Sequence, residues 1–108
     1  TVYGRMGIFG SPYAALDFTV VNPELAEFDR SATALDQFRA LVDAVHGKGG
    51  KIFIDIAINH TGWGAKLHET HPEWFVREPS GAFHSQGAWG VTWGDLTELD
   101  HTREDLWK

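Results

Sequence analysis

The sequence of 108 residues contains no cysteine, so it offers neither a disulfide framework nor a thiolate metal site. It also has no apolar stretch near the roughly 20 residues that a membrane-spanning helix requires, which argues against a membrane protein. The chain starts at Thr1 without an initiator methionine or an apolar signal segment. We therefore expect a cut piece of a longer protein or a mature product.

Basic residues are scarce. Nine Lys and Arg stand against fifteen Asp and Glu, which gives a net charge of −6, and no basic run occurs. This balance argues against a nucleic-acid or anionic-membrane partner. Internal repeats, low-complexity tracts and linkers are also missing, so we predict at most one domain, with a modest core that hides roughly two thirds of the unfolded surface.

Aromatic residues and glycine are abundant by contrast. The chain has seven Phe, five Trp, two Tyr and twelve Gly. Aromatic rings among glycines suit carbohydrate sites, where flat sugar faces stack on the rings, and they equally suit an aromatic core beneath long loops. The sequence alone leaves both interpretations open.

The most regular stretch runs from Lys51 to Ile58, where four isoleucines alternate with other side chains, including Asp55. This period predicts a strand, and because neither face is built for water, we expect a strand buried on both sides in a parallel sheet or barrel. A carboxylate in such a strand is costly unless it is paired. Asp55 is therefore a candidate functional residue or a buried residue that ties down a neighbouring loop.

A helix is predicted just before this strand, over 33–47. Thr33 and Asp36 form a capping signal, apolar residues recur at helical spacing, and Gly49 and Gly50 supply the stop. Residues 1–30 are predicted as a long loop with one short extended piece near 18–21, and 61–96 as a loop-built subdomain with a short helix near 72–76 and an irregular hairpin. Residues 99–108 read as a turn that opens a further helix.

The predicted strand has no confident parallel neighbour in the chain, so its backbone N–H and C=O groups need a partner. Either the aromatic loops provide one or another chain does. We favour self-association, as a homo-oligomer or a strand-exchanged assembly.

Four motifs in order identify a family. The segment Asp55-Ile-Ala-Ile-Asn59-His60 resembles the Asp-x-x-x-Asn-His motif at the end of the third barrel strand in the α-amylase family, glycoside hydrolase family 13. Residues 10–23, with a tyrosine, an Asp-Phe pair and an Asn-Pro, are similar to that family's long loop after strand two. The helix ahead of the strand is similar to the family's second helix, and residues 96–100, Leu-Thr-Glu-Leu-Asp, resemble a motif near the end of its loop subdomain.

The resemblance implies a role for each matching residue. His60 would donate a hydrogen bond to a hydroxyl of the glucose unit in the cleavage subsite, and Tyr13 would stack its ring under the same sugar. Asp55 would help to fix the charged network around the catalytic groups, and Asp17 would brace the loop that carries Tyr13. Each of these residues also has a purely structural interpretation, as a packing or loop-closing side chain.

The resemblance further implies a calcium site. Asn59 would offer its side-chain carbonyl oxygen to the calcium ion that ties the loop subdomain to the barrel in many members. Glu98 stands where such members often have a calcium-ligating aspartate. Because the glutamate arm is longer, a solvated acidic turn is an equally good interpretation of Glu98.

In fold class, the resemblance implies an α/β protein, a partial (β/α) TIM-barrel fragment with one central parallel-type strand, one full helix and a loop-rich subdomain. Residues 1–60 would be the barrel segment, 61–97 the loop subdomain, and 98–108 the start of helix three. In the family, a carboxylate nucleophile and a carboxylic acid about 5 Å apart act with retention, and they come from later strands. We therefore expect this chain to carry part of a subsite for an α-glucan or maltooligosaccharide. We do not expect it to hydrolyse the glucan alone.

Two interpretations from other classes are weighed beside this one. A carbohydrate-binding module would use a platform of four tryptophans, Trp63, Trp74, Trp89 and Trp93. A zinc protein would use His60, His68, His71 and Glu69, but His68 and His71 are three residues apart, not four as in the helical His-Glu-x-x-His motif. The proline that follows His71 also argues against a continuing helix.

Overall fold

A computed structural model of the chain describes residues 3–5 and 11–108. Its strands and helices follow in chain order: β1 (Tyr3–Arg5), β2 (Ala15–Val21), η1 (Pro23–Leu25), α1 (Ala34–Gly47), β3 (His60–Gly62), α2 (Lys66–Thr70), η2 (Pro72–Trp74), β4 (Ser85–Ala88), β5 (Val91–Glu98) and η3 (Glu104–Leu106). The three η elements are short 3₁₀ turns. None of the helices in these ranges combines the length and apolar character needed to cross a bilayer.

The sheets are antiparallel. β1 pairs with β2, and β5 lies between β3 and β4 in a three-stranded sheet. β4 and β5 form a bulged hairpin, which confirms the irregular hairpin predicted from the sequence. The predicted extended piece near 18–21 is confirmed as part of β2. The coarse class, a small mixed α/β protein, is therefore confirmed, whereas α2, β1 and β3 were not predicted.

Helix α1 forms as predicted. The Thr33 hydroxyl accepts a hydrogen bond from the Asp36 amide, and the Asp36 carboxylate accepts one from the Thr33 amide, so the capping box is complete. Gly49 beyond the helix adopts a φ of 76°, which a residue without a Cβ tolerates best. Nevertheless, no residue of α1 is buried, and Phe38, Val42 and Val45 are only half-buried, so its apolar face is incompletely covered.

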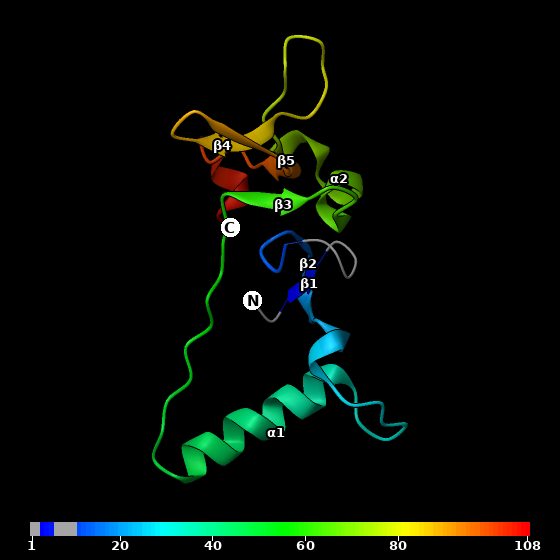
Figure 1. Cartoon of the computed structure of the whole chain (residues 1–108), viewed down its shortest axis with the longest axis vertical. Coiled ribbons are helices and arrows are strands. Elements are labelled where there is room, and N and C mark those ends of the chain that lie inside the picture. Colours follow the sequence, from blue (N-terminus) through cyan, green and yellow to red (C-terminus); the bar gives the residue numbers. More distant parts are fainter. Residues whose placement is uncertain (1–2, 6–10) are drawn as a thin grey trace.

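The prediction of a paired strand over 51–58 is wrong. The segment is extended and irregular, and in Figure 1 it runs from the end of α1 to β3 without a neighbouring strand. Of its isoleucines, Ile54, Ile56 and Ile58 are 42–47% exposed, and Phe53 is 89% exposed. A strand exists only where a ladder of hydrogen bonds holds it. The aromatic loops provide no such ladder, because β3, β4 and β5 pair with one another.

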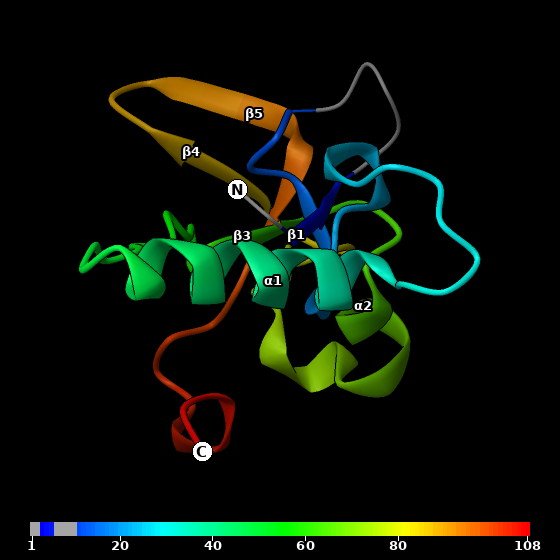
Figure 2. The same ribbon diagram turned by 90° about the horizontal axis from the view of Figure 1, so that it is seen from below.

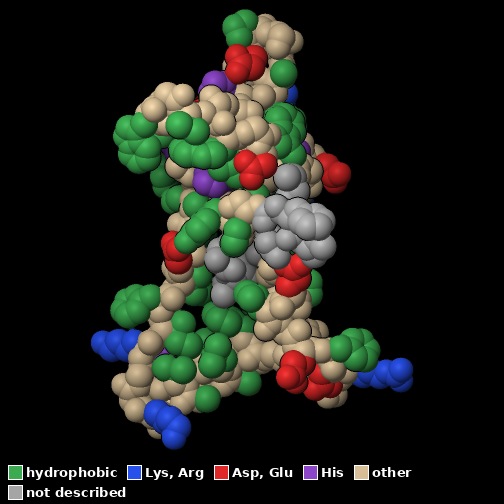
Figure 3. All heavy atoms as spheres, in the orientation of Figure 1, with side chains coloured by type: hydrophobic (Ala, Val, Ile, Leu, Met, Phe, Trp, Pro, Cys, Tyr) green, Lys and Arg blue, Asp and Glu red, His purple; other side chains and the backbone are tan. Residues whose placement is uncertain are grey.

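The molecule is consequently elongated. Its Cα radius of gyration is 16.1 Å, compared with about 13 Å for a compact domain of this size. Figure 1 shows α1 at one end, the three-stranded sheet at the other and β1 and β2 between them, and Figure 2 shows the same chain from below. Hydrophobic side chains are visible between α1 and the extended segment in Figure 3.

The best-packed part lies around the three-stranded sheet. Thr61 of β3 and Thr97 of β5 face each other in register and are fully buried. Their hydroxyl oxygens are 2.8 Å apart, and Thr97 Oγ1 is also 2.9 Å from Nε2 of His68. The His68 ring packs on Phe75 and Phe83, at centroid distances of 4.3 and 4.5 Å. These contacts give 60–99 a small core of its own.

Candidate functional site

A tight turn at 11–14 presents Tyr13 to solvent. The Ala14 amide donates to the Ser11 carbonyl at 2.9 Å, and the Tyr13 amide donates to the Ser11 hydroxyl at 3.2 Å. Ala14 is fully buried against β3: a Cβ on Gly62 would lie 2.8 Å from the Ala14 carbonyl oxygen. The turn therefore rests directly on β3, and the Tyr13 side chain remains 43% exposed.

The three residues predicted to bind substrate lie in one network. The Tyr13 hydroxyl donates to the Asp55 carboxylate at 2.5 Å, and Nε2 of His60 lies 3.0 Å from the Tyr13 carbonyl oxygen. Since a carbonyl can only accept, Nε2 carries the proton in this contact. Tyr13 and His60 are 47 positions apart in the sequence, and Tyr13 and Asp55 are 42 positions apart. The two hydrogen bonds join them at the end of the extended segment.

Burial and hydrogen bonding tune this network. His60 is 7% exposed, and burial lowers its pKa, although the bond to Tyr13 and the negative charge of Asp95 oppose the shift. His60 is thus neutral at pH 7, with a buried Nδ1 that has no hydrogen-bond partner among the described residues. The bond to Asp55 raises the pKa of the Tyr13 phenol. Sequence reasoning missed Asp95, which no motif marked.

Asp17 lies in β2, near the Tyr13 turn. Its carboxylate accepts hydrogen bonds from the amide and hydroxyl of Thr19 and lies 3.6 Å from Lys66 of α2. The Thr19 bonds and then the Lys66 charge hold the pKa of Asp17 below its usual value. Asp17 therefore links β2 to α2. That Asp17 also braces the loop that carries Tyr13 stays a prediction.

The two residues predicted to bind calcium have other partners. The backbone carbonyl of Asn59 accepts from the Leu99 amide at 3.0 Å, and its side chain is exposed. The Glu98 carboxylate lies 3.3 Å from Nε2 of His84, whose Nδ1 contacts Glu78. Calcium takes six to eight oxygen ligands, and these two side chains alone do not supply that set. Calcium binding here stays a prediction.

The residues weighed for zinc are engaged separately. His68 bonds Thr97, as described above, and burial lowers the pKa of its imidazole, helped by the charge of Arg77. His71 stacks on Trp74 with ring centroids 3.8 Å apart and contacts Glu73. Across residues 3–5 and 11–108, no three His, Cys, Asp or Glu side chains gather as a metal site would require.

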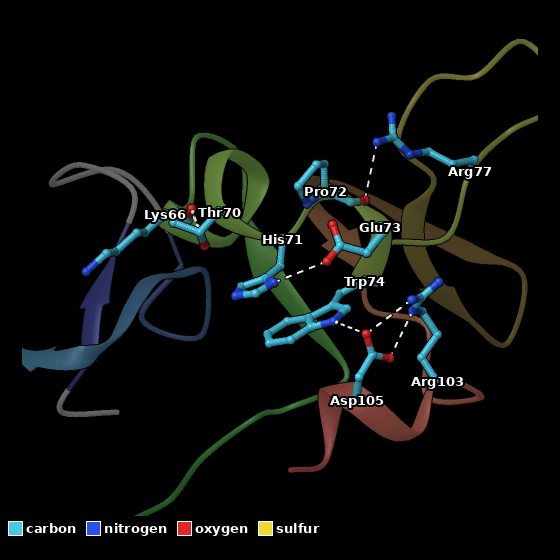
Figure 4. A network of polar contacts seen from close by, with 9 residues as sticks. All are labelled: Lys66, Thr70, His71, Pro72, Glu73, Trp74, Arg77, Arg103 and Asp105. Atoms are coloured by element: carbon cyan, nitrogen blue, oxygen red, sulfur yellow. Dashed lines mark hydrogen bonds and ion pairs between the residues drawn. The ribbon is translucent and has the colours of Figure 1, made fainter.

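Figure 4 shows the polar contacts around Trp74. Its indole N–H donates to Asp105 at 3.0 Å, and Arg103 makes two hydrogen bonds to the same carboxylate. The Arg103 bonds and then the Trp74 bond lower the pKa of Asp105 to about 2. Trp74 thereby anchors η3 to η2.

The four tryptophans of the alternative platform differ in their surroundings. The Trp63 indole donates to the Gly94 carbonyl at 2.8 Å, and its ring contacts Phe83. Trp74 is held as shown in Figure 4. The side chains of Trp89 and Trp93, in contrast, have no hydrogen-bond or ring partner in the described part of the chain. The structure therefore separates two structural tryptophans from two unengaged ones.

Comparisons with known proteins agree on one class of enzyme. No protein-family model matches the chain. Trehalose synthase/amylase TreS of Mycobacterium tuberculosis, in two strains, is 36% identical over 83 residues, which cover 74% of this chain. An α-amylase structure from Lactobacillus plantarum is similar with a TM-score of 0.77 and 36% identity over 96% of the chain. A maltogenic α-amylase, AmyB, from Thermotoga neapolitana gives 0.73 and 28% over 95%.

These relatives are much longer than the sequence. The chain spans 12% of the length of the curated relatives and 22% of each of the two solved structures. The likeness therefore concerns one part of each relative.

Buried His60 and half-buried His68 predict a dependence of stability on pH. In the unfolded chain their pKa is about 6.5, whereas in the fold burial lowers the pKa of both His60 and His68. The unfolded state therefore takes up protons first as the pH falls. Their contribution to stability is complete above about pH 6.5 and is lost as the pH falls through the lower folded values.

We expect the free energy of unfolding, measured by urea denaturation, to decrease between about pH 7.5 and about pH 5. His68→Gln keeps a hydrogen-bonding group and removes one titrating ring, so its stability should depend less steeply on pH. A stability that is constant over this range in the parent chain, or a slope that His68→Gln leaves unchanged, would contradict this assignment.

Proposed function

The chain belongs to the α-amylase family, glycoside hydrolase family 13, and we propose that Tyr13, His60 and Asp55 form part of its glucose subsite for an α-glucan. In this proposal residues 1–60 come from a (β/α) barrel, 61–97 from its loop subdomain and 98–108 from the following helix. The parent enzyme would be a glucan hydrolase or a glucanotransferase. The single observation that carries the proposal is the network joining Tyr13 to both Asp55 and His60.

The network has the properties that a sugar subsite needs. Tyr13 is 43% exposed; its phenol hydroxyl bonds Asp55, and its backbone carbonyl accepts a hydrogen bond from His60. A ring held in this way loses little conformational freedom when a pyranose stacks on it. The carboxylate accepts hydrogen bonds from hydroxyl groups, and the neutral imidazole avoids a charge that an uncharged sugar would not compensate.

The same geometry argues against hydrolysis by this chain alone. Retention needs a nucleophilic carboxylate and a carboxylic acid about 5 Å apart. Within the described residues, the only carboxylate that bonds to Tyr13 or His60 is Asp55, and it already accepts the Tyr13 hydroxyl. The chain therefore binds glucan without cleaving it.

Titration with maltoheptaose, followed by tryptophan fluorescence and calorimetry, tests the proposal. Tyr13→Ala removes the ring and should weaken binding about tenfold or more, whereas Tyr13→Phe keeps the ring and should lose less. Soluble starch should release no reducing ends. Equal affinity for all three proteins, or inhibitor-sensitive starch hydrolysis by the purified chain, would overturn the proposal.

We also propose that the uncovered segment 51–58 pairs with the same segment of a second copy. An antiparallel pair centred on Phe53 would place Lys51 opposite Asp55 and Ile52 opposite Ile54, so charges and apolar side chains both match. A groove of about 600 Å³ beside Ile56 and Ile58 leaves further apolar surface to cover.

Sedimentation velocity over a hundredfold range of concentration tests this pairing. Ile54→Pro removes a backbone donor that has no partner within the described residues, so it should leave the monomer folded and abolish the dimer. A parent chain that is monomeric throughout, or a proline variant that dimerises equally, would rule out pairing through 51–58.

A further inference from the structure

The turn between β4 and β5 contains a residue that does not suit it. Trp89 and Gly90 connect the paired residues Ala88 and Val91, with φ values of 51° and 77°. Two central residues with positive φ define a type I′ turn, in which asparagine, aspartate and glycine are favoured. Trp89 is the only non-glycine residue with positive φ in the described part of the chain. Its backbone conformation is therefore strained.

Packing does not offset this strain. Trp89 is 96% exposed, and its ring has no contact partner among the described residues. The contrast with Trp107 is informative, because that residue is also exposed, at 59%, yet its indole donates to the His101 carbonyl. A side chain that strains its turn and contacts nothing does not stabilise the fold. Conflicts with local preference of this kind are expected at functional sites.

The same hairpin carries two further exposed apolar side chains, and we call Trp89, Val91 and Trp93 together the hairpin patch. Val91 is 53% exposed and Trp93 is 38% exposed, and since they are two residues apart in β5, they point to the same face. Figure 2 shows the β4–β5 hairpin extending away from β3 and α2. In Figure 3, hydrophobic side chains gather over the same hairpin.

The chemistry of the hairpin selects its ligand. Residues 85–94 include no charged side chain, so the hairpin patch offers nothing to a phosphate, a carboxylate or an ammonium group. It offers indole faces beside small polar groups, Ser85, Gln86 and Thr92. Indole faces stack on flat, uncharged rings that carry hydroxyl groups on their edges. A neutral sugar chain meets that description.

We propose that the hairpin patch is a second sugar contact, where Trp89 stacks on a pyranose of a neutral α-glucan beyond the unit held at Tyr13. This inference rests on the proposed function for the identity of the sugar. The type I′ turn holds the ring outward before binding, so that less freedom is lost when the sugar arrives.

The variant Trp89→Asn tests the proposal sharply, because asparagine suits a positive φ. The variant should melt at the same or a higher temperature than the parent chain, so a loss of binding cannot come from unfolding. We expect its affinity for maltoheptaose to fall about tenfold, with a smaller loss for maltose, because two glucose units can bridge fewer contacts than seven. Phe28→Ala removes another ring that is 89% exposed and should bind like the parent.

The outcomes separate the two proposals. Weaker binding by Trp89→Asn with unchanged binding by Phe28→Ala supports the hairpin contact. Unchanged binding by Trp89→Asn, while Tyr13→Ala binds weakly, overturns the hairpin contact and leaves the proposed function intact. Equal losses for maltose and maltoheptaose also contradict a second contact. No binding of either sugar by the parent chain overturns both proposals.

Discussion

The hydroxyl pair of Thr61 and Thr97 is the interaction on which the rest of this structure depends. Both side chains are fully buried between β3 and β5, where an unpaired hydroxyl would be costly. Each satisfies the other, and His68 completes the chain of hydrogen bonds while its ring fills the space beside Phe75 and Phe83. Few other polar contacts in the chain are so well enclosed.

The candidate sugar subsite is a consequence of this pairing. Because β3 is fixed on β5, His60 at the start of β3 is buried and oriented, and Gly62 provides the flat surface on which Ala14 and the Tyr13 turn rest. The subsite thus joins two units that are distant in sequence. The same sheet carries the β4–β5 hairpin, so both proposed sugar contacts are attached to one rigid element.

Local signals in the sequence predicted local structure. The capping box at Thr33 and Asp36 defined α1, and the glycines around Trp89 indicated a hairpin. The motif Asp55 to His60 and the loop motif with Tyr13 led to three residues that the structure brings together, although their roles stay predictions. The prediction that failed depended on tertiary pairing: segment 51–58 has no strand partner within the described residues, so its isoleucine period does not give a paired strand. β3 itself was missed because its three residues are too few to show a period.

Native-state hydrogen exchange tests the central claim that β3 and β5 carry the stability of the chain. The amides of Val76, Glu98 and Leu99 donate to carbonyls in and around this sheet, so we predict that they exchange most slowly, with free energies near that of global unfolding. The amides of α1, which has no buried residue, should exchange much faster. Slowest exchange in α1, with rapid exchange in β3 and β5, would contradict the account.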